Sequence, residues 1–186
     1  DYQGSSSDGW LNPIEGPTSA GTWYYPGGGV HLGVDRAVSV GTPIHAPADG
    51  LIVWAANPAD TNGGYLGNWA GYPNGAGNNI AMLVRVNDTT YFVSFSHMAQ
   101  YGMTVSAGDS VSQGDVIGLT GNSGNSSGAH CHIEIINLGS MSISEAASQF
   151  ASTADFAWGC GWSSPSTGCD SKGSTPCRER PETLIG

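Results

Sequence analysis

The sequence has few charged side chains, and positive charge is the scarcest. Asp, Glu, Lys and Arg make up 11% of the residues, whereas an average soluble protein has about 25%. Only five residues are Lys or Arg, and the net charge is −10. Because no cluster of basic side chains is available to neutralise a run of phosphates, we expect no nucleic-acid binding. The same shortage argues against attraction to an anionic membrane surface.

Long apolar runs are also missing. No stretch approaches the roughly 20 apolar residues needed to cross a bilayer, so we expect no membrane insertion. The chain begins at Asp1, with neither Met nor a basic and apolar leader, which favours a processed or excised domain. In place of charge there are 29 glycines and many Ser, Thr and Asn. This composition is typical of an all-β extracellular protein rich in turns, and the length suits one domain with a hydrophobic core.

Four cysteines occur in the second half of the chain, three of them close together in loop-like sequence: Cys131, Cys160, Cys169 and Cys177. This arrangement fits disulfide bonds formed in an oxidising compartment. We therefore expect at least one disulfide and a secreted, extracellular protein. Free thiols are the alternative, and the spacing does not choose among the possible pairings.

The order of apolar and turn-forming residues predicts mainly β structure. A run of branched and aromatic residues over 51–55 predicts a buried strand. Segments 80–86 and 91–97, joined by an Asn-Asp-Thr turn, predict a hairpin. Segment 129–136 is the last core strand that we expect. The polar segment 1–22, rich in Gly, Ser and Pro, favours an arm laid over the surface.

One helix is predicted in the C-terminal part, over residues 142–156. Ser144 is the expected cap, and Glu145 favours the first turn through the helix dipole. Apolar residues at helical spacing then predict a buried stripe, formed by Ala146, Ala147, Phe150 and Ala151.

Residues 57–78 form an unusually long connection, rich in Gly and Asn. Loops of this length are uncommon and usually functional or disordered. Three large aromatic side chains, which a purely solvated linker seldom has, lie within it: Tyr65, Trp69 and Tyr72. They indicate either a small hydrophobic cluster or a wall of a substrate groove.

Two of the five histidines are separated by one residue, in His130-Cys131-His132. In a strand, residues two apart lie on one face, so both imidazoles project together while Cys131 points the opposite way. One histidine can then bind a metal while the other stays available for proton transfer. A His-x-His pair alone is more often a feature of an ordinary strand, so the motif is weak by itself.

His31 and Asp35 are spaced as i and i+4, but Gly33 and three preceding glycines argue against a helix. We expect a bent loop that brings the two side chains together. A catalytic zinc typically has three protein ligands and an open fourth position, and two imidazoles with one carboxylate are such a set. A structural zinc would prefer four closed ligands, often thiolates, but the cysteines lack the paired CxxC spacing.

Two other ionisable residues are left out of the predicted site. His45 stands apart from the other histidines, which favours a packing or groove-edge role. Glu134 shares a strand face with His130 and His132. No HExxH helix is present to aim its carboxylate at a water molecule, so we leave Glu134 out of the catalytic set.

Several short motifs follow one another between residues 21 and 138. They are Gly-Val-His31-Leu-Gly-Val-Asp35, Gly-Thr-Pro43, Ala-Asp-Gly50, Phe-Ser-His97-Met, Val-Ser-Gln-Gly-Asp-Val-Ile-Gly118, Thr-Gly-Asn-Ser-Gly124 and Gly-Ala-His130-Cys-His132-Ile-Glu. In this order they resemble the lysostaphin/LytM-type zinc metallopeptidases, a family of peptidoglycan endopeptidases. The resemblance implies antiparallel β-sheets that form an open substrate groove, with one helix inserted in the C-terminal part.

The resemblance also implies the roles of particular residues. One zinc ion would be held by His31, Asp35 and His132. His97 and His130 would form the catalytic pair. A tyrosine shortly before the first ligand would stabilise the transition state, and we expect Tyr25 in this role, with Tyr24 as the alternative.

The implied function is zinc-dependent hydrolysis of peptide cross-links in bacterial peptidoglycan, by a secreted bacteriolytic enzyme that we expect to be a monomer. Two alternatives stay open: a degenerate, non-catalytic cell-wall-binding module of the same fold, and a zinc amidase acting on peptidoglycan. A lipoyl- or biotinyl-type carrier would need a lysine at a turn tip, whereas the only lysine is Lys172, in the tail.

We expect residues 1–186 to form a single catalytic domain. It would consist of an N-terminal arm (1–20), a metallopeptidase core (21–138), a cysteine-containing insertion with the helix (139–178) and a C-terminal segment (179–186). The long 57–78 connection, Cys131 in place of an aliphatic residue and the insertion depart from the family pattern.

Overall fold

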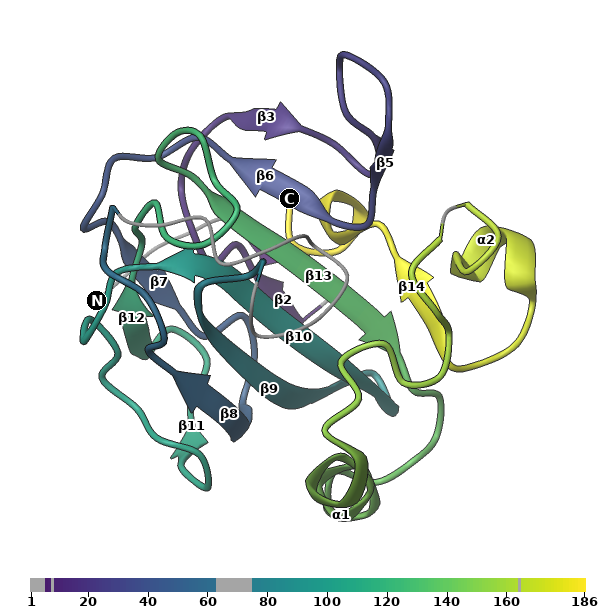
Figure 1. Ribbon diagram of the computed structural model, residues 1–186. Coiled ribbons are helices and arrows are strands. Elements are labelled where there is room, and N and C mark those ends of the chain that lie inside the picture. Colours follow the sequence, from purple (N-terminus) through teal and green to yellow (C-terminus); the bar gives the residue numbers. More distant parts are fainter. Residues whose placement is uncertain (1–5, 8, 63–74, 164) are drawn as a thin grey trace.

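The computed structural model (Figure 1) describes residues 6–7, 9–62, 75–163 and 165–186. In these residues antiparallel strands dominate, and the only α-helices are α1 (Ile143–Thr153) and α2 (Cys169–Lys172). The predicted mainly β fold with a helix in the C-terminal part is therefore confirmed. Neither described helix has the length and apolar character needed to cross a membrane. Tyr65, Trp69 and Tyr72 of the long connection lie outside the described residues.

The main sheet is antiparallel throughout and carries most of the described strands. Its order is β11 (Ser110–Val111), β8 (Gly50–Ala56), β9 (Asn78–Val86), β10 (Thr89–Met98), β13 (Cys131–Asn137), β6 (Val34–Arg36) and β3 (Thr18–Ala20), and β14 (Cys177–Glu179) also pairs with β13. Three small two-stranded sheets flank it: β1 (Ser6–Ser7) with β2 (Trp10–Leu11), β12 (Val116–Leu119) with β7 (Pro43–His45), and β4 (Trp23–Tyr24) with β5 (Val30–His31).

The predicted hairpin is confirmed as β9 and β10, the two longest strands. Its two-residue turn consists of Asn87 and Asp88, whose φ angles of 50° and 64° lie in the left-handed region. Asn and Asp tolerate this conformation better than most residues, and it matches the twist of a tight hairpin. The turn residues therefore set the register that brings His97, near the end of β10, beside β13.

β9 is buried on both faces of the sheet, which explains its unbroken run of apolar residues. Ile80, Met82 and Val84 contribute to the larger core cluster, together with Phe95 and other side chains on that face. Their neighbours Ala81 and Leu83 point into a second cluster, which α1 covers with Phe150. Strand alternation thus divides one apolar segment between two cores.

The helix α1 differs in detail from its prediction. It is capped by Ser142, not Ser144: the Ser142 hydroxyl accepts a hydrogen bond from the backbone N–H of Glu145 at 3.1 Å. Ser142 and Glu145 have the sequence spacing of a capping box, and the Ser142 hydroxyl also donates to Glu145 Oε1 at 3.1 Å. Ala146 and Phe150 are buried as predicted, whereas Ala151 is exposed, so the predicted stripe was too wide. The helix ends at Thr153 because Ala154 adopts a left-handed conformation.

The described part of the N-terminal segment, from residue 9 to residue 20, is integrated into the fold and is more than an arm on the surface. Trp10 and Ile14 are buried in the larger core, and the ring of Trp10 meets Tyr91 edge-on at 5.0 Å between centroids. β3 then adds an edge strand beside β6. The bulky apolar side chains of this glycine-rich segment therefore anchor it to the core.

One disulfide joins Cys169 to Cys177, so the expectation of at least one bonded pair is confirmed. It links α2 to the start of β14. Cys131 is a buried free thiol, and Cys160 is a partly buried one. Burial raises the pKa of the Cys131 thiol well above its usual value, so Cys131 serves packing behind the neighbouring histidines.

Candidate metal centre

Three neighbouring strands bring the predicted metal ligands together. His31 ends β5, Asp35 lies in β6, and His132 lies in β13 directly opposite Asp35. Gly33 permits the close approach of the chain to β13, because a Cβ atom at this position would lie 2.1 Å from the Ile133 carbonyl oxygen. The bent His31–Asp35 segment therefore depends on glycine at its centre.

The three donor atoms form a compact triangle. His31 Nε2 lies 3.1 Å from His132 Nδ1, His132 Nδ1 lies 2.9 Å from Asp35 Oδ1, and Asp35 Oδ1 lies 3.2 Å from His31 Nε2. Donors bound to one tetrahedral zinc at roughly 2.0–2.1 Å would lie about 3.3 Å apart. The donor types and the size of the triangle therefore fit a zinc ion, with one position open.

The other ring nitrogen of each ligand histidine is held by a hydrogen-bond acceptor. His31 Nδ1 donates to the Gly21 carbonyl oxygen at 2.7 Å, and His132 Nε2 donates to Glu134 Oε2 at 2.9 Å. These bonds keep a proton on the outer nitrogen, so that the inner nitrogen, once it has lost its own proton, would direct its lone pair toward the shared point. Both rings are therefore oriented for ligation before a metal binds.

The electrostatics of the centre keep its carboxylates ionised. Burial by itself raises the pKa of Asp35, but hydrogen bonds from His132 and His31 outweigh it and hold the pKa well below its usual range. Burial lowers the pKa of His132, yet the hydrogen bonds and charges of Asp35 and Glu134 raise it to about 9. In the metal-free protein His132 is therefore protonated on both ring nitrogens at neutral pH, and a metal must displace the proton on Nδ1.

His97 reaches the same region through an irregularity in β10. The pairing between β9 and β10 shifts register between Phe95 and Met98, and His97 has a φ of 62°, in the left-handed region. A bulge of this kind re-aims a side chain next to a functional site. His97 Nδ1 donates to the Ser123 carbonyl oxygen at 2.7 Å, so Nε2 is the unprotonated nitrogen.

Burial, followed by the charges of His130 and His132, lowers the pKa of His97 to about 3. His97 is therefore neutral at physiological pH, with its proton on Nδ1. Its ring centroid lies 4.6 Å from that of His130 and 6.2 Å from that of His132.

His130 lies just before β13 and is partly exposed. Its Nδ1 donates to the Gly128 carbonyl oxygen at 2.7 Å, and its Nε2 lies 3.7 Å from Asp35 Oδ1. The structure thus brings His97 and His130 together beside the donor triangle. In both of them Nδ1 is held by a backbone carbonyl group.

Tyr25, and not Tyr24, lines the centre. The ring of Tyr25 stacks on that of His31 with 4.2 Å between centroids, whereas Tyr24 projects outward from β4 with 57% of its surface exposed. The turn after Tyr25 passes through Gly28 and Gly29. Their φ angles of 94° and 96° lie in the left-handed region, which glycine adopts more easily than other residues. Burial, then the charges of Asp35 and Glu134, raise the pKa of Tyr25, so its hydroxyl stays protonated at neutral pH.

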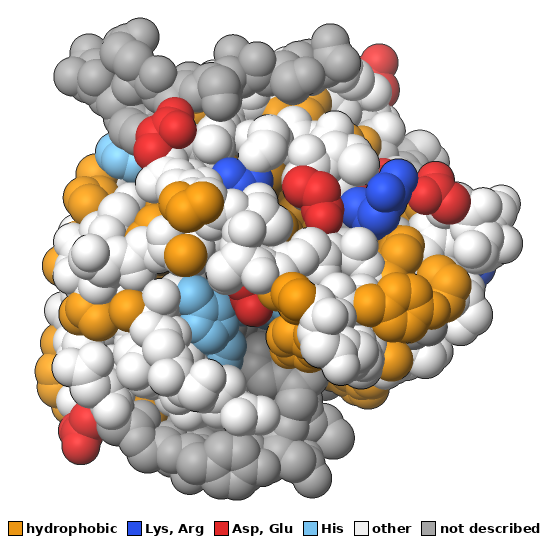
Figure 2. All heavy atoms as spheres, turned by 90° about the horizontal axis from the view of Figure 1, so that it is seen from above, with side chains coloured by type: hydrophobic (Ala, Val, Ile, Leu, Met, Phe, Trp, Pro, Cys, Tyr) orange, Lys and Arg blue, Asp and Glu red, His pale blue; other side chains and the backbone are white. Residues whose placement is uncertain are grey.

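Apart from His31, these side chains line one cavity of about 420 Å³. Figure 2 shows histidine side chains and a carboxylate in a hollow near the middle of one face, with hydrophobic side chains beside it. The lining residues are Tyr25, Val30, Asp35, His97, Asn125, Ser126, Ser127, His130 and His132. Apart from the histidines and Asp35, the lining is uncharged, which suits a neutral peptide substrate.

Sequence reasoning left Glu134 out of the site, but the structure places it in contact with His132. It is 2% exposed, and its other oxygen, Oε1, accepts a hydrogen bond from Arg178 Nη1 at 2.6 Å. Burial raises the pKa of Glu134, but the charge of Arg178 and then the hydrogen bond from His132 lower it to about 2. The alternation pattern had placed Glu134 on the correct face; nothing in the sequence pointed to its partner Arg178, which lies 44 residues further along the chain.

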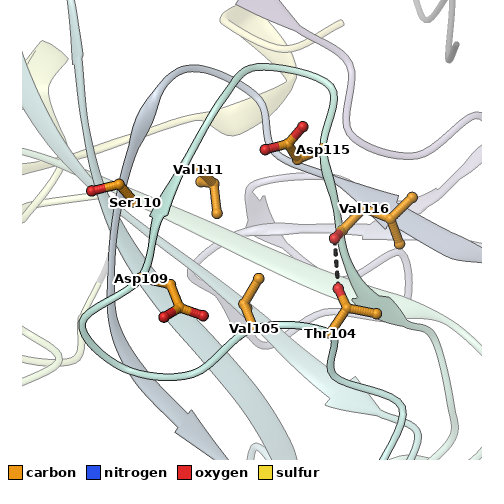
Figure 3. Close-up of a pocket in the computed structure, with 7 residues that line it drawn as sticks. All are labelled: Thr104, Val105, Asp109, Ser110, Val111, Asp115 and Val116. Atoms are coloured by element: carbon orange, nitrogen blue, oxygen red, sulfur yellow. Dashed lines mark hydrogen bonds between the residues drawn. The ribbon is translucent and has the colours of Figure 1, made fainter.

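A second hollow shares no lining residue with this cavity (Figure 3). It is lined by Thr104, Val105, Asp109, Ser110, Val111, Asp115 and Val116. Its two aspartates stabilise turns, since Asp109 accepts a hydrogen bond from the Ser106 N–H and Asp115 accepts one from the Ser112 N–H, both at 2.9 Å. His45 also lies outside the cavity lining; its Nδ1 donates to the Gly114 carbonyl oxygen, in keeping with the predicted packing role.

The chain is similar to a known protein family and to several of its characterised members. A model of peptidase family M23 matches residues 29–143. Lysostaphin of Staphylococcus simulans is 32% identical over 165 residues, which cover 86% of this chain and 29% of lysostaphin. The glycyl-glycine endopeptidase ALE-1 of Staphylococcus capitis is 33% identical over 135 residues, covering 71% of this chain and 32% of ALE-1. The peptidoglycan DD-endopeptidase ShyA of Vibrio cholerae is 32% identical over 109 residues, covering 59% of this chain and 21% of ShyA.

The chain thus spans less than a third of the length of each of these relatives. Among solved structures, the catalytic domain of lysostaphin from S. simulans aligns with a TM-score of 0.51 at 30% identity, covering 76% of this chain and 92% of that domain. A zinc-containing peptidase from Vibrio cholerae aligns with a TM-score of 0.52 at 22% identity, covering 72% of this chain and 40% of that one, a likeness of fold alone. The predicted lysostaphin-type fold is confirmed.

Proposed function

Because the chain belongs to peptidase family M23, we propose that it is a zinc-dependent endopeptidase that hydrolyses peptide cross-links of bacterial peptidoglycan. The observation that carries this proposal is the donor triangle of His31, Asp35 and His132, with two further histidines at the same cavity. The names of the relatives support an endopeptidase, since one is a glycyl-glycine endopeptidase and another is a peptidoglycan DD-endopeptidase. A degenerate module would be expected to lack part of this set.

The ligands would hold zinc through His31 Nε2, Asp35 Oδ1 and His132 Nδ1. When bound, zinc acts as a Lewis acid that polarises a peptide carbonyl group and makes water a stronger nucleophile. Glu134 and the Gly21 carbonyl group keep the two imidazoles in the orientation that ligation needs.

We assign proton transfer to His97 and His130. With Nδ1 donating to a backbone carbonyl oxygen, each presents Nε2 as the basic nitrogen, which can accept a proton from the attacking water and deliver it to the leaving amine. Tyr25, protonated and stacked on His31, is placed to donate a hydrogen bond to the oxygen that becomes negatively charged in the transition state.

The proposed location is extracellular, at the bacterial cell wall, and the proposed state is a monomer. The Cys169–Cys177 disulfide supports an oxidising compartment. Size-exclusion chromatography with light scattering would test the oligomeric state, and a mass of two chains would contradict the monomer.

The decisive experiment is digestion of purified sacculi with different cross-bridges, followed by mass spectrometry of the released fragments. We expect new amino termini within the peptide part of at least one sacculus type, and none after treatment with His132→Ala. Cleavage between glycan and stem peptide would instead identify an amidase. No new termini from any sacculus would favour the non-catalytic wall-binding module.

A further inference from the structure

The C-terminal segment, residues 177–186, lies outside the region that matches the family, yet it contacts the groups that hold both ligand histidines. It consists of β14, Arg180, the 3₁₀ turn η1 (Pro181–Thr183) and the last three residues. Figure 1 shows it in yellow, running from β14 beside β13 back toward β6. We propose that Arg178 and Glu182 of this segment are positioning residues of the metal centre. The inference rests on the metal site proposed above.

Arg178 acts on His132 through Glu134. Its Nη1 donates to Glu134 Oε1 at 2.6 Å, while Glu134 Oε2 accepts from His132 Nε2 at 2.9 Å. Each carboxylate oxygen thus has a different partner, and this fixes the plane of the carboxylate. Without Arg178 the carboxylate could rotate about its own bond, and the ring of His132 would lose its fixed orientation.

Arg178 is itself rigidly held. Its side chain is almost fully buried, Nη2 donates to the Gly161 carbonyl oxygen at 3.0 Å, and the guanidinium carbon lies 5.2 Å from the centroid of the Trp162 ring. The preceding residue, Cys177, is bonded to Cys169. Main-chain pairing of Arg178 with Ile136 of β13 completes the support. The donor that reaches Glu134 therefore has little freedom to move.

Glu182 acts on His31 through the backbone of the short connection between β3 and β4. Its Oε2 accepts from the Thr22 N–H at 3.0 Å, and its Oε1 accepts from the Thr22 hydroxyl at 2.6 Å. Thr22 follows Gly21, the residue whose carbonyl oxygen accepts from His31 Nδ1 at 2.7 Å. A single carboxylate thus fixes the peptide that orients the first metal ligand.

The same segment supplies matched controls. Within the part of the chain that the structure describes, Arg180 forms one ion pair, with the exposed Asp170 at 3.6 Å. Glu179 accepts a hydrogen bond from Asn137 Nδ2 at 3.1 Å. Both have the charge of a proposed positioning residue, but their contacts lead away from the ligands. Arg180→Gln and Glu179→Gln should therefore leave metal binding unchanged.

The test measures metal affinity directly, in the whole chain. Each variant is stripped of metal, its fold is checked by circular dichroism, and its zinc dissociation constant is determined by competition with a chromogenic chelator. Cobalt(II) is then added, and its visible absorption spectrum reports the geometry of the ligands. Neither readout depends on hydrolysis of a substrate.

We expect Arg178→Gln to raise the zinc dissociation constant about 10–100-fold, the range typical of lost second-sphere hydrogen bonds, and to change the cobalt spectrum. Arg178→Lys should restore part of the affinity, since an ammonium group can donate to Glu134 but not also to Gly161. Glu182→Gln should have a smaller effect, because the amide oxygen still accepts one of the two hydrogen bonds.

Folded variants with a dissociation constant within twofold of the wild type, and with the wild-type cobalt spectrum, would overturn the inference and leave only a structural role. If Arg178→Gln does not fold, Arg178→Lys and Glu182→Gln decide by the same criteria. Absence of zinc binding by the wild-type chain is a separate result, which would overturn the proposed function itself.

Discussion

At the scale of single residues, the two histidines that are not proposed ligands differ in their surroundings. His97 is buried on the bulge of β10, whereas His130 is partly exposed at the start of β13. The rings nevertheless lie 4.6 Å apart between centroids and face the same cavity. Proton transfer by either one is compatible with this geometry, so the variants must be compared.

Replacing either histidine should abolish most of the activity without loss of metal. We expect His97→Ala and His130→Ala to lower kcat by about 10²–10⁴-fold, the contribution typical of general acid–base catalysis. Hydrolysis of a peptide substrate measures kcat, and elemental analysis measures zinc. A variant that kept both zinc and full lytic activity would exclude that histidine from proton transfer.

The two adjacent tyrosines provide a matched pair. Tyr25→Phe removes the hydroxyl group beside His31 and should lower kcat by about 10²–10³-fold, the usual effect of losing one oxyanion donor. Tyr24→Phe should leave kcat unchanged, because the Tyr24 side chain lies outside the cavity lining. Equal effects of both substitutions on kcat would contradict the assignment.

Metal binding should release a proton from His132. Its pKa is raised to about 9 in the metal-free protein, so it is protonated at pH 7 and must lose this proton to bind zinc. Zinc affinity should therefore increase with pH up to about pH 9 and then level off. The proton on His132 stabilises the metal-free fold below the unfolded pKa of about 6.5, and this contribution is lost as pH rises through about 9.

Calorimetric titration with zinc in buffers of different ionisation enthalpy counts the released protons. In Glu134→Gln, which lacks one of the two charges that raise the pKa of His132, fewer protons should be released at pH 7. Release that is independent of Glu134 would contradict this account.

At the scale of elements, α1 shows how a local signal decides a boundary. Ser142 and Ser144 are both plausible caps by residue type, but only Ser142 precedes a glutamate by three residues, as a capping box requires. We expect Ser142→Ala to lower the free energy of unfolding by about 1 kcal/mol. Ser144→Ala should change it by less than about 0.5 kcal/mol, because Ser144 is an exposed residue within the helix. Urea unfolding of both variants distinguishes the two caps.

The catalytic elements divide into those that sequence could predict and those that it could not. The grouping of His31, Asp35 and His132 was predictable because the order of the motifs resembles that of the lysostaphin/LytM-type family, although each motif is weak by itself. The hairpin of β9 and β10 was predictable from its turn and its apolar runs. The bulge that re-aims His97 was not, since a left-handed φ at a histidine has no local sequence signal. The Glu134–Arg178 pair depends on β14 pairing with β13, a contact between distant segments that no local pattern encodes.

At the scale of the whole molecule, the metal ligands join segments from opposite ends of the family region. A bound zinc ion should therefore stabilise the entire fold and not one loop. At a free zinc concentration of about 1,000 times the dissociation constant, binding contributes about 4 kcal/mol, so its removal should lower Tm by about 8–16 °C. Calorimetric melting with and without a chelator measures this shift, and His132→Ala, which lacks one ligand, should melt at the same temperature in both conditions.

His31 and His132 are 101 positions apart in the sequence, and β13 is synthesised after β5 and β6. During translation, the ribosome releases His31 and Asp35 long before it releases their third partner. A chain that is still being made holds an incomplete ligand set, and only pairing of β13 with β6 closes it. If the proposed function holds, metal capture has to wait until β13 has been synthesised and paired with β6, and hydrolytic activity would arise only after that step.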